Sequence, residues 1–150
     1  MGLKTLVGEG DHVMGLALPF AAVGVAANLI WPSAFHMGFG SAGLAVGIVV
    51  LAVGVPFWLT SVVQILINVP RKRLITTGPF AVMLHPLYTT VALLVIPGCG
   101  LLLDTWVGFA IGAVLYISSR IFSPREEKLL AEEFADRFAS YRAKVLLPWL

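Results

Sequence analysis

The stretch LITTGPFAVMLHPLYTT, from Leu74 to Thr90, divides the chain into two long apolar halves. It contains a Gly-Pro pair, a His-Pro pair and a tyrosine, and apolar runs of membrane length lie on both sides of it. We call it the central stretch. Any chemistry that this chain performs is expected at the central stretch or directly beside it.

The composition is that of an integral membrane protein. Of the 150 residues, 59% are hydrophobic and 12% are charged, whereas a soluble domain has about 25% charged residues. Between Val13 and Pro70 there is no Asp, Glu, Lys or Arg. This pattern excludes the basic patch that nucleic acid would require. The single cysteine, Cys99, excludes an intrachain disulfide and a cysteine-based metal site, and we expect no metal.

Four apolar runs predict four transmembrane helices: Val13–Trp31, Phe39–Val69, Pro86–Leu103 and Thr105–Phe122. Only Asp104 separates the last two runs, so they should form a tight helical hairpin. The fold is therefore expected to be all-α, an integral membrane bundle.

Glycines predict where the helices approach each other closely. Gly43 and Gly47 stand one helical turn apart, as do Gly108 and Gly112, and such small residues allow close helix packing in lipid. The Pro97–Gly100 segment should distort the third helix near its far end.

The basic residues predict the orientation. Four crossings place both termini on one side, together with Arg71–Arg73 and every basic residue from Arg120 onward. The two opposite turns contain no Lys or Arg, so the positive-inside rule places the termini and the central stretch in the cytoplasm. The Ala- and Gly-rich composition suggests a bacterial source, and hence the inner (plasma) membrane.

A separate amphipathic helix is expected after the last crossing. Ser123 is placed to cap it, Pro124 suits its first position, and Glu126 stands three residues after the cap. An apolar stripe then recurs every three to four residues, at Leu130, Phe134, Phe138, Tyr141 and Val145. Because the other face is rich in acidic residues, we expect this helix to cover the central stretch as a lid rather than to adhere to anionic lipid.

Two groups of polar residues are candidates for chemistry. His85-Pro86 should begin a membrane helix, whose free N–H groups and dipole attract anions; the alternative is that His85 is a structural hydrogen-bonding residue. Glu126 is explained by helix capping, but Glu127 is not, and a paired acid near His85 would bind a cation or an amine. Arg120 flanks this pair, with positive-inside anchoring as its alternative role. The chain contains no Walker loop, HExxH, GxSxG or dinucleotide glycine fingerprint.

Two sequence blocks resemble a known superfamily. Residues 74–80, LITTGPF, followed by HPLY at 85–88, resemble the signature LVTxGPYxxxRHPxY. The tail, with EEKLL at 126–130 followed by Phe134, Tyr141 and Val145, resembles the ending EExxL…F…Y…V. In this order, the blocks are similar to those of the isoprenylcysteine carboxyl methyltransferase and phospholipid methyltransferase superfamily. The resemblance extends from Leu74 to about Val145.

The resemblance implies methyl transfer from S-adenosylmethionine bound at the cytoplasmic interface. Carried over position by position, the cofactor-binding residues would be Gly78, Pro79, Phe80, His85, Pro86, Tyr88, Glu126 and Glu127. A helix N-terminus with His85 would suit the methionyl carboxylate, and a glutamate would suit its amine or the ribose hydroxyls. Glu127 would also take up a proton from an amine or hydroxyl acceptor.

The chain departs from the superfamily at positions that bear on the acceptor. Leu84 and Ala81 stand where arginines are usual. If those arginines hold an acidic acceptor, this chain methylates something else or uses Arg120 or Arg125 in their place. The expected acceptor is lipophilic or membrane-embedded, such as an isoprenylcysteine-like carboxylate or a lipid amine.

The expected organisation is one membrane domain over residues 1–150, in which residues 1–73 form two N-terminal helices and residues 74–150 the cofactor-binding core. Two other interpretations remain open. One is an NADPH-dependent membrane reductase that shares the C-terminal scaffold. The other is a small non-enzymatic membrane protein that assembles with partners through its glycine faces.

Overall fold

The computed structural model describes the backbone of residues 3–150 and the side chains of residues 13–150. Regular structure in this range is helical, which confirms the all-α prediction. The elements are α1 (Leu3–Ile30), α2 (Pro32–Phe35), α3 (Gly40–Asn68), α4 (Pro79–Val82), α5 (Pro86–Thr90), a π-helical segment η1 (Val91–Val95), α6 (Ile96–Leu102), α7 (Val107–Phe134) and α8 (Asp136–Arg142).

Three helices in the described part of the chain are long and apolar enough to cross a membrane: α1 over Val13–Ile30, α3, and α7. The fourth predicted crossing, formed by α5, η1 and α6 from Pro86 to Leu102, is apolar but shorter. It falls below the ~20 residues of a typical span. The length criterion therefore supports three of the four predicted crossings.

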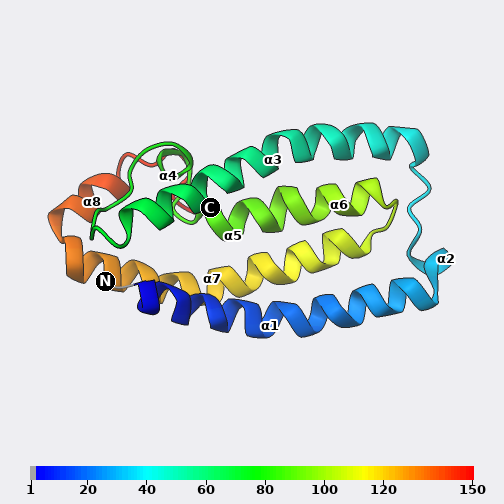
Figure 1. The fold of residues 1–150 in the computed structure, drawn as a ribbon, viewed down its shortest axis with the longest axis horizontal. Helices are drawn as coiled ribbons and strands as arrows, with labels where there is room; N and C mark the ends of the chain where they lie inside the picture. Colours follow the sequence, from blue (N-terminus) through cyan, green and yellow to red (C-terminus); the bar gives the residue numbers. More distant parts are fainter. Residues whose placement is uncertain (1–2) are drawn as a thin grey trace.

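The long helices lie side by side along the long axis of the molecule (Figure 1). α1 packs on α7, α7 on η1 and α6, and α6 on α3. The first two long helices of the chain are thus separated by the later hairpin. Val13, Ala17, Ala92 and Leu115 are buried together where α1, η1 and α7 meet.

Glycines bring these helices into backbone contact. A Cβ atom on Gly108 would lie 2.7 Å from the Cα of Gly100, and one on Gly47 would lie 3.0 Å from the carbonyl oxygen of Gly98. Gly43, Gly47, Gly108 and Gly112 are all buried. The predicted close helix approach is confirmed, and it takes place inside the chain.

The helix distortion predicted within Pro97–Gly100 is found just before these residues instead. α6 runs unbroken through these residues to Leu102, and the irregular segment is the π-helical turn Val91–Val95 that precedes them. A proline ring clashes with the carbonyl group four residues before it. The widened turn before Pro97 relieves that clash, so the distortion falls on the N-terminal side of the proline.

The prediction of a separate helix beginning at Ser123 is wrong. α7 continues through Pro124 to Phe134, and α8 follows after a break at Ala135, whose φ is 42°. The Ser123 hydroxyl donates a hydrogen bond to the carbonyl oxygen of Ser119 at 2.6 Å, inside α7, and so does not cap a new helix. The apolar helix reaching Ser123 from upstream overrides the local capping signal.

The predicted tight hairpin turn is present and is tied to the α2–α3 connection. The backbone N–H groups of Phe39 and Gly40 donate to the Asp104 carboxylate at 3.1 and 3.3 Å. The Thr105 hydroxyl donates to Asn28 in α1 at 2.8 Å. Polar contacts thereby join two connections and the last part of α1 at this end of the molecule.

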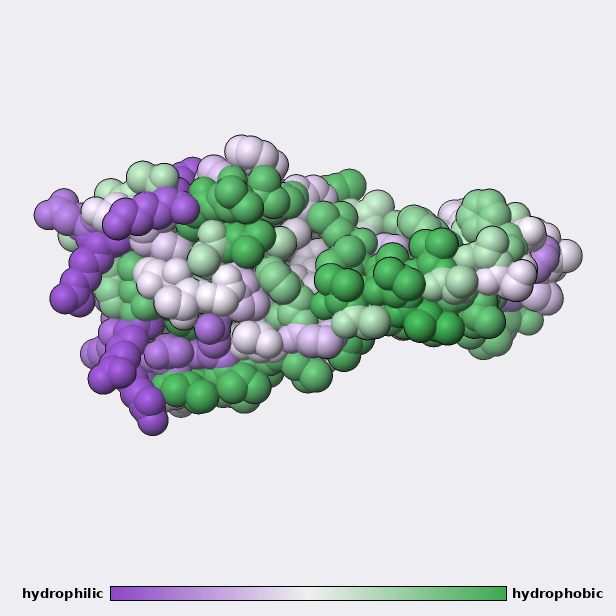
Figure 2. Space-filling model, turned by 90° about the horizontal axis from the view of Figure 1, so that it is seen from above, coloured by the Kyte–Doolittle hydropathy of each residue, from purple (hydrophilic) through white to green (hydrophobic). Residues whose placement is uncertain are grey.

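Hydrophilic residues gather at the other end of the molecule (Figure 2). We call this the charged end; it contains residues 69–85 and 120–150, including α4 and α8 (Figure 1). On the face shown in Figure 2, most of the remaining length is apolar, as expected of helices in contact with lipid.

The contact between Gly108 and Gly100 predicts a sharp difference between two glycine-to-alanine substitutions. Gly108→Ala should destabilise the protein by about 1–3 kcal/mol, because the new methyl group meets backbone atoms that cannot move aside. Gly15→Ala is the control, since a Cβ there meets nothing within 4 Å. Thermal unfolding in detergent micelles measures both, and equal stability of the two variants would contradict the packing described.

Candidate functional site

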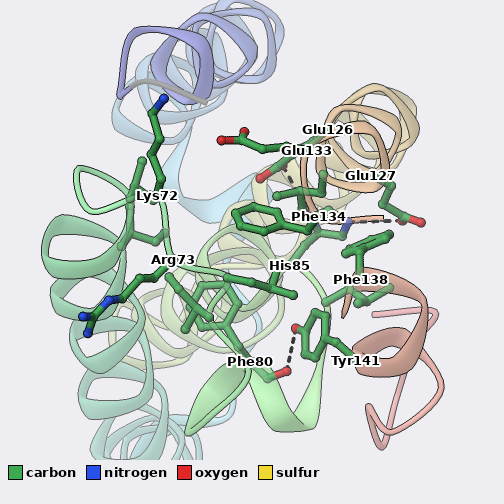
Figure 3. Close-up of a pocket in the computed structure, with 16 residues that line it drawn as sticks. Lys72, Arg73, Phe80, His85, Glu126, Glu127, Glu133, Phe134, Phe138 and Tyr141 are labelled. Carbon is green, nitrogen blue, oxygen red and sulfur yellow. Dashed lines mark hydrogen bonds and ion pairs between the residues drawn. The ribbon is translucent and has the colours of Figure 1, made fainter. Parts of the chain in front are cut away.

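A cavity of about 70 Å³ lies at the charged end. Its lining comes from the end of α3, the loop that follows it, the central stretch, α7 and α8 (Figure 3). Lys72 and Arg73 lie on one side, and Glu126, Glu127 and Glu133 come from α7 on another. The cavity therefore brings together segments that are far apart in the sequence.

An apolar cluster positions α8 over the central stretch. Leu84, Phe138, Tyr141 and Val145 are buried together, and Leu74, Phe80, Leu130 and Phe134 pack against them. The predicted apolar stripe thus does cover the central stretch, although it is divided between α7, α8 and the residues after α8. Leu146 and Leu147 extend the contact by donating backbone hydrogen bonds to the carbonyl oxygens of Ala81 and Val82.

A single hydrogen bond joins α8 to α4 at the cavity wall. The Tyr141 hydroxyl donates to the carbonyl oxygen of Phe80 at 2.7 Å (Figure 3). Burial raises the pKa of the Tyr141 phenol above its usual value, so it stays protonated and able to donate at neutral pH.

His85 stands at the centre of a charged network. Its Nδ1 lies 3.5 Å from Glu126 and its Nε2 lies 3.3 Å from Glu127. Glu127 is also paired with Arg142 of α8 at 3.0 Å. The histidine side chain is only 5% exposed, so these contacts are made largely away from water.

This network sets the protonation state of His85. Burial alone would lower the pKa of the imidazole, but the hydrogen bonds and charges of Glu126 and Glu127 outweigh that effect and raise the pKa to about 9. His85 is therefore an imidazolium at neutral pH. An imidazolium can donate hydrogen bonds and stabilise negative charge, but it cannot accept a proton as a general base.

The predicted helix start at His85-Pro86 is confirmed, and the backbone N–H groups that precede the helix are already paired. Pro86 is the first residue of α5. The backbone N–H groups of Leu84 and His85 donate to the carbonyl oxygen of Leu150, at 2.9 and 3.4 Å. In this arrangement the two groups are already satisfied, and an anion would have to displace the C-terminal segment to reach them.

The predicted cofactor residues divide into two sets. Phe80, His85, Glu126 and Glu127 line the cavity. Gly78, Pro79, Pro86 and Tyr88 are not in its lining. Gly78 has a φ of 61° and lies against Gln64 of α3, Pro79 and Pro86 are buried, and Tyr88 packs against the core between α1 and α7.

Arg120 faces a different hollow, beside Arg142 and Trp149. Its Nη1 atom is buried and has no hydrogen-bond partner among the described residues. The structure therefore does not place Arg120 in the lining of the His85 cavity.

Sequence reasoning did not select three polar residues of the cavity. Lys72 and Arg73 had been explained as positive-inside anchors, and Glu133 as part of a solvated helix face. Glu133 lies seven residues after Glu126, two helical turns along α7, and this spacing is a signal that could have placed both on one face.

The lining suits S-adenosylmethionine chemically, but the cavity is too small for the whole molecule. Carboxylates suit its ammonium group, Lys72 and Arg73 suit its carboxylate, and the rings of Phe80, Phe134 and Phe138 suit its adenine. Ligand pockets of this kind typically measure about 300–1,000 Å³, against about 70 Å³ here. Binding would therefore require the cavity wall to move.

Residues 37–137 match the family model described as phospholipid methyltransferase. This match spans more than half of the chain and includes α3, where the sequence motifs gave no resemblance. No curated protein and no solved structure matches the chain.

The raised pKa of His85 predicts a pH-dependent stability. Because the folded pKa, about 9, lies above the ordinary 6.5, the stabilisation is complete below pH 6.5 and is lost as the pH rises through 9. When complete, this stabilisation contributes about 3 kcal/mol to the free energy of unfolding. We expect the unfolding temperature to fall from pH 7 to about pH 9.5 more steeply in the wild-type protein than in His85→Asn. His36→Asn is the control and should follow the wild-type curve.

Proposed function

We propose that this chain, which belongs to the phospholipid methyltransferase family, transfers a methyl group from S-adenosylmethionine to a lipophilic or membrane-embedded acceptor. The observation that carries the proposal is the His85 cavity. It combines acidic, basic and aromatic side chains at the end of a membrane bundle. Such a cavity suits a zwitterionic, adenine-containing cofactor on one side and an acceptor from the bilayer on the other.

The protein's own contribution would be alignment and exclusion of water. When bound, the cofactor supplies a methyl group already activated by the sulfonium, so the reaction needs a correctly placed acceptor more than it needs acid–base assistance. Glu126 and Glu133 would hold the cofactor ammonium, and Lys72 or Arg73 its carboxylate. The rings of Phe80, Phe134 and Phe138 would enclose the adenine.

Glu127 has two possible contributions in this scheme. Its contacts with His85 and Arg142 make it a positioning residue for the charged network. An acceptor amine or hydroxyl releases a proton when it is methylated, and Glu127 is the carboxylate that we propose takes it up. Arg120, with an unpaired buried Nη1, is the proposed partner for an acidic acceptor group approaching from its own side.

Cofactor entry would require α8 to move. Ala135, with a φ of 42°, lies between α7 and α8, and a non-glycine residue in this region is strained by about 1–3 kcal/mol. Two polar contacts hold α8 closed, namely Tyr141 to Phe80 and Arg142 to Glu127. Opening would also require α8 to leave the apolar cluster around Leu84 and the backbone hydrogen bonds of Leu146 and Leu147 to break, after which α8 could turn about Ala135 and enlarge the cavity.

The membrane placement that we propose follows from the charges. The charged end would face the cytoplasm, with both termini, because the positive-inside rule assigns Arg71–Arg73 to that side. The hairpin of α5–α6 and α7 would complete a four-crossing bundle in a bacterial inner membrane, with the Pro86–Leu102 arm covered partly by its neighbours α3 and α7.

One observation bears on each alternative function. Lys72 and Arg73 are joined by further cations beside the cavity, which would suit the phosphates of NADPH in a reductase. The glycine faces required by a non-enzymatic assembly protein are occupied inside the chain, at the contacts of Gly47 with Gly98 and Gly108 with Gly100.

Calorimetry on the purified protein tests the proposed cofactor. S-adenosylhomocysteine should bind with a dissociation constant in the micromolar range or tighter, corresponding to about 8 kcal/mol, whereas NADPH should not bind. Binding of NADPH alone would replace the methyltransferase proposal with the reductase interpretation.

Two variants with matched controls test the site. Glu127→Gln and His85→Ala should each weaken S-adenosylhomocysteine binding by about tenfold or more, since both disrupt the charged network. Glu132→Gln and His36→Ala make the same chemical changes at exposed positions outside the cavity lining and should leave binding unchanged. Equal affinities in all four variants would place the cofactor elsewhere.

The acceptor is identified by labelling. Membranes that contain the protein, incubated with S-adenosylmethionine labelled on the methyl group, should transfer label to a lipid-extractable product. Label confined to the aqueous fraction would contradict a lipophilic acceptor. Label that base releases as methanol would indicate a methyl ester on a carboxylate, and label that base does not convert to methanol would indicate an amine, hydroxyl or thiol.

A further inference from the structure

A second hollow lies beside the His85 cavity and has a different charge. It is an open groove of about 740 Å³ between the loop that follows α3 and the α8 segment. Its lining residues are Lys72, Arg73, Leu74, Thr76, Asp136, Arg137, Ser140, Tyr141 and Lys144. Because Lys72, Arg73 and Tyr141 also line the cavity, the two hollows share a wall.

The groove carries an excess of positive charge. It holds four cationic side chains and one acidic side chain. None of Lys72, Arg73, Arg137 and Lys144 forms an ion pair with any side chain in the described range 13–150, whereas the nearby Arg142 is paired with Glu127. Cations held around a shared hollow repel each other, so the groove is suited to an anion.

The position of the groove indicates which anion is available. Lys72 follows the last residue of α3 by four positions, so it lies just beyond the end of a membrane-length helix. Lipid phosphates are concentrated at this depth, and basic residues beside a membrane helix are attracted to anionic lipid. The hydroxyl groups of Thr76 and Ser140 line the same groove and can donate hydrogen bonds to phosphate oxygens.

We propose that the groove binds the phosphate group of an anionic lipid headgroup. Lys72 and Arg73 come from the loop after α3, and Arg137 and Lys144 come from the α8 segment. A phosphate between them contacts both segments at once and so fastens α8 to the loop. The ligand is a bound lipid rather than the methyl acceptor, and the proposal holds whether or not the His85 cavity transfers methyl groups.

Thermal unfolding in lipid nanodiscs tests the proposal. Discs of phosphatidylcholine are compared with discs that contain about 20% phosphatidylglycerol, which is anionic but has no amine or carboxylate to methylate. Binding to the folded state stabilises it, so phosphatidylglycerol should raise the unfolding temperature by about 3 °C or more.

Two double variants separate the groove from the general surface charge. Arg137→Gln with Lys144→Gln changes groove residues that do not line the cavity, and it should abolish most of the rise in unfolding temperature. Arg71→Gln with Lys128→Gln removes the same charge from exposed positions at the same end and should keep the rise. If the first double variant does not fold, Lys144→Gln alone, which lies beyond the last residue of α8, should lose about half of the rise.

Two results would overturn the proposal. Equal loss of the rise in both double variants would show a general attraction to a negative membrane. A full rise produced by about 10 mM inorganic phosphate in phosphatidylcholine discs would show that the ligand is a soluble anion. Neither readout involves cofactor or methyl transfer, so failure here is distinguishable from failure of the proposed function.

Discussion

One buried imidazolium, held between two adjacent glutamates, joins the segments of the charged end. His85 belongs to the central stretch, Glu126 and Glu127 belong to α7, and Glu127 connects in turn to Arg142 of α8. A buried charge is costly unless it is paired, so these segments are held to one another. The apolar cluster and the cavity form around this network, and the proposed chemistry would therefore use groups that also maintain the fold.

The residue before His85 shows how this chain differs from the superfamily that it resembles. Leu84 stands where an arginine is usual, and it is 7% exposed in a cluster with Phe138 and Tyr141. A guanidinium at this place would be buried among apolar side chains, which is strongly unfavourable. The chain has apolar packing against α8 at this point, and its cavity cations, Lys72 and Arg73, come from the loop after α3 instead.

Local patterns in the sequence predicted the helices, but contacts between distant residues decided the site. The apolar runs predicted the bounds of α3 to within one residue at each end, and the glycine spacing predicted which face of α3 packs against a neighbouring helix. The capping pattern at Ser123 wrongly predicted a helix start because it depends on a few neighbouring residues only. α7, which continues through Ser123, is stabilised over its whole length. No spacing rule pairs Glu127 with Arg142, or places Leu150 on the N–H group of His85. These depend on how α8 folds back.

The unbroken course of α7 makes membrane thickness relevant to the site. Its 28 residues form a rod about 42 Å long, which exceeds a hydrocarbon core of about 30 Å. Gly112, packed against η1 and α6, and Glu126 move as parts of one body, so the bilayer sets the height of the glutamates relative to the lipid headgroups. Lengthening or shortening the acyl chains of the surrounding lipid would shift that height, or tilt the rod, and so change which part of an embedded molecule reaches the cavity.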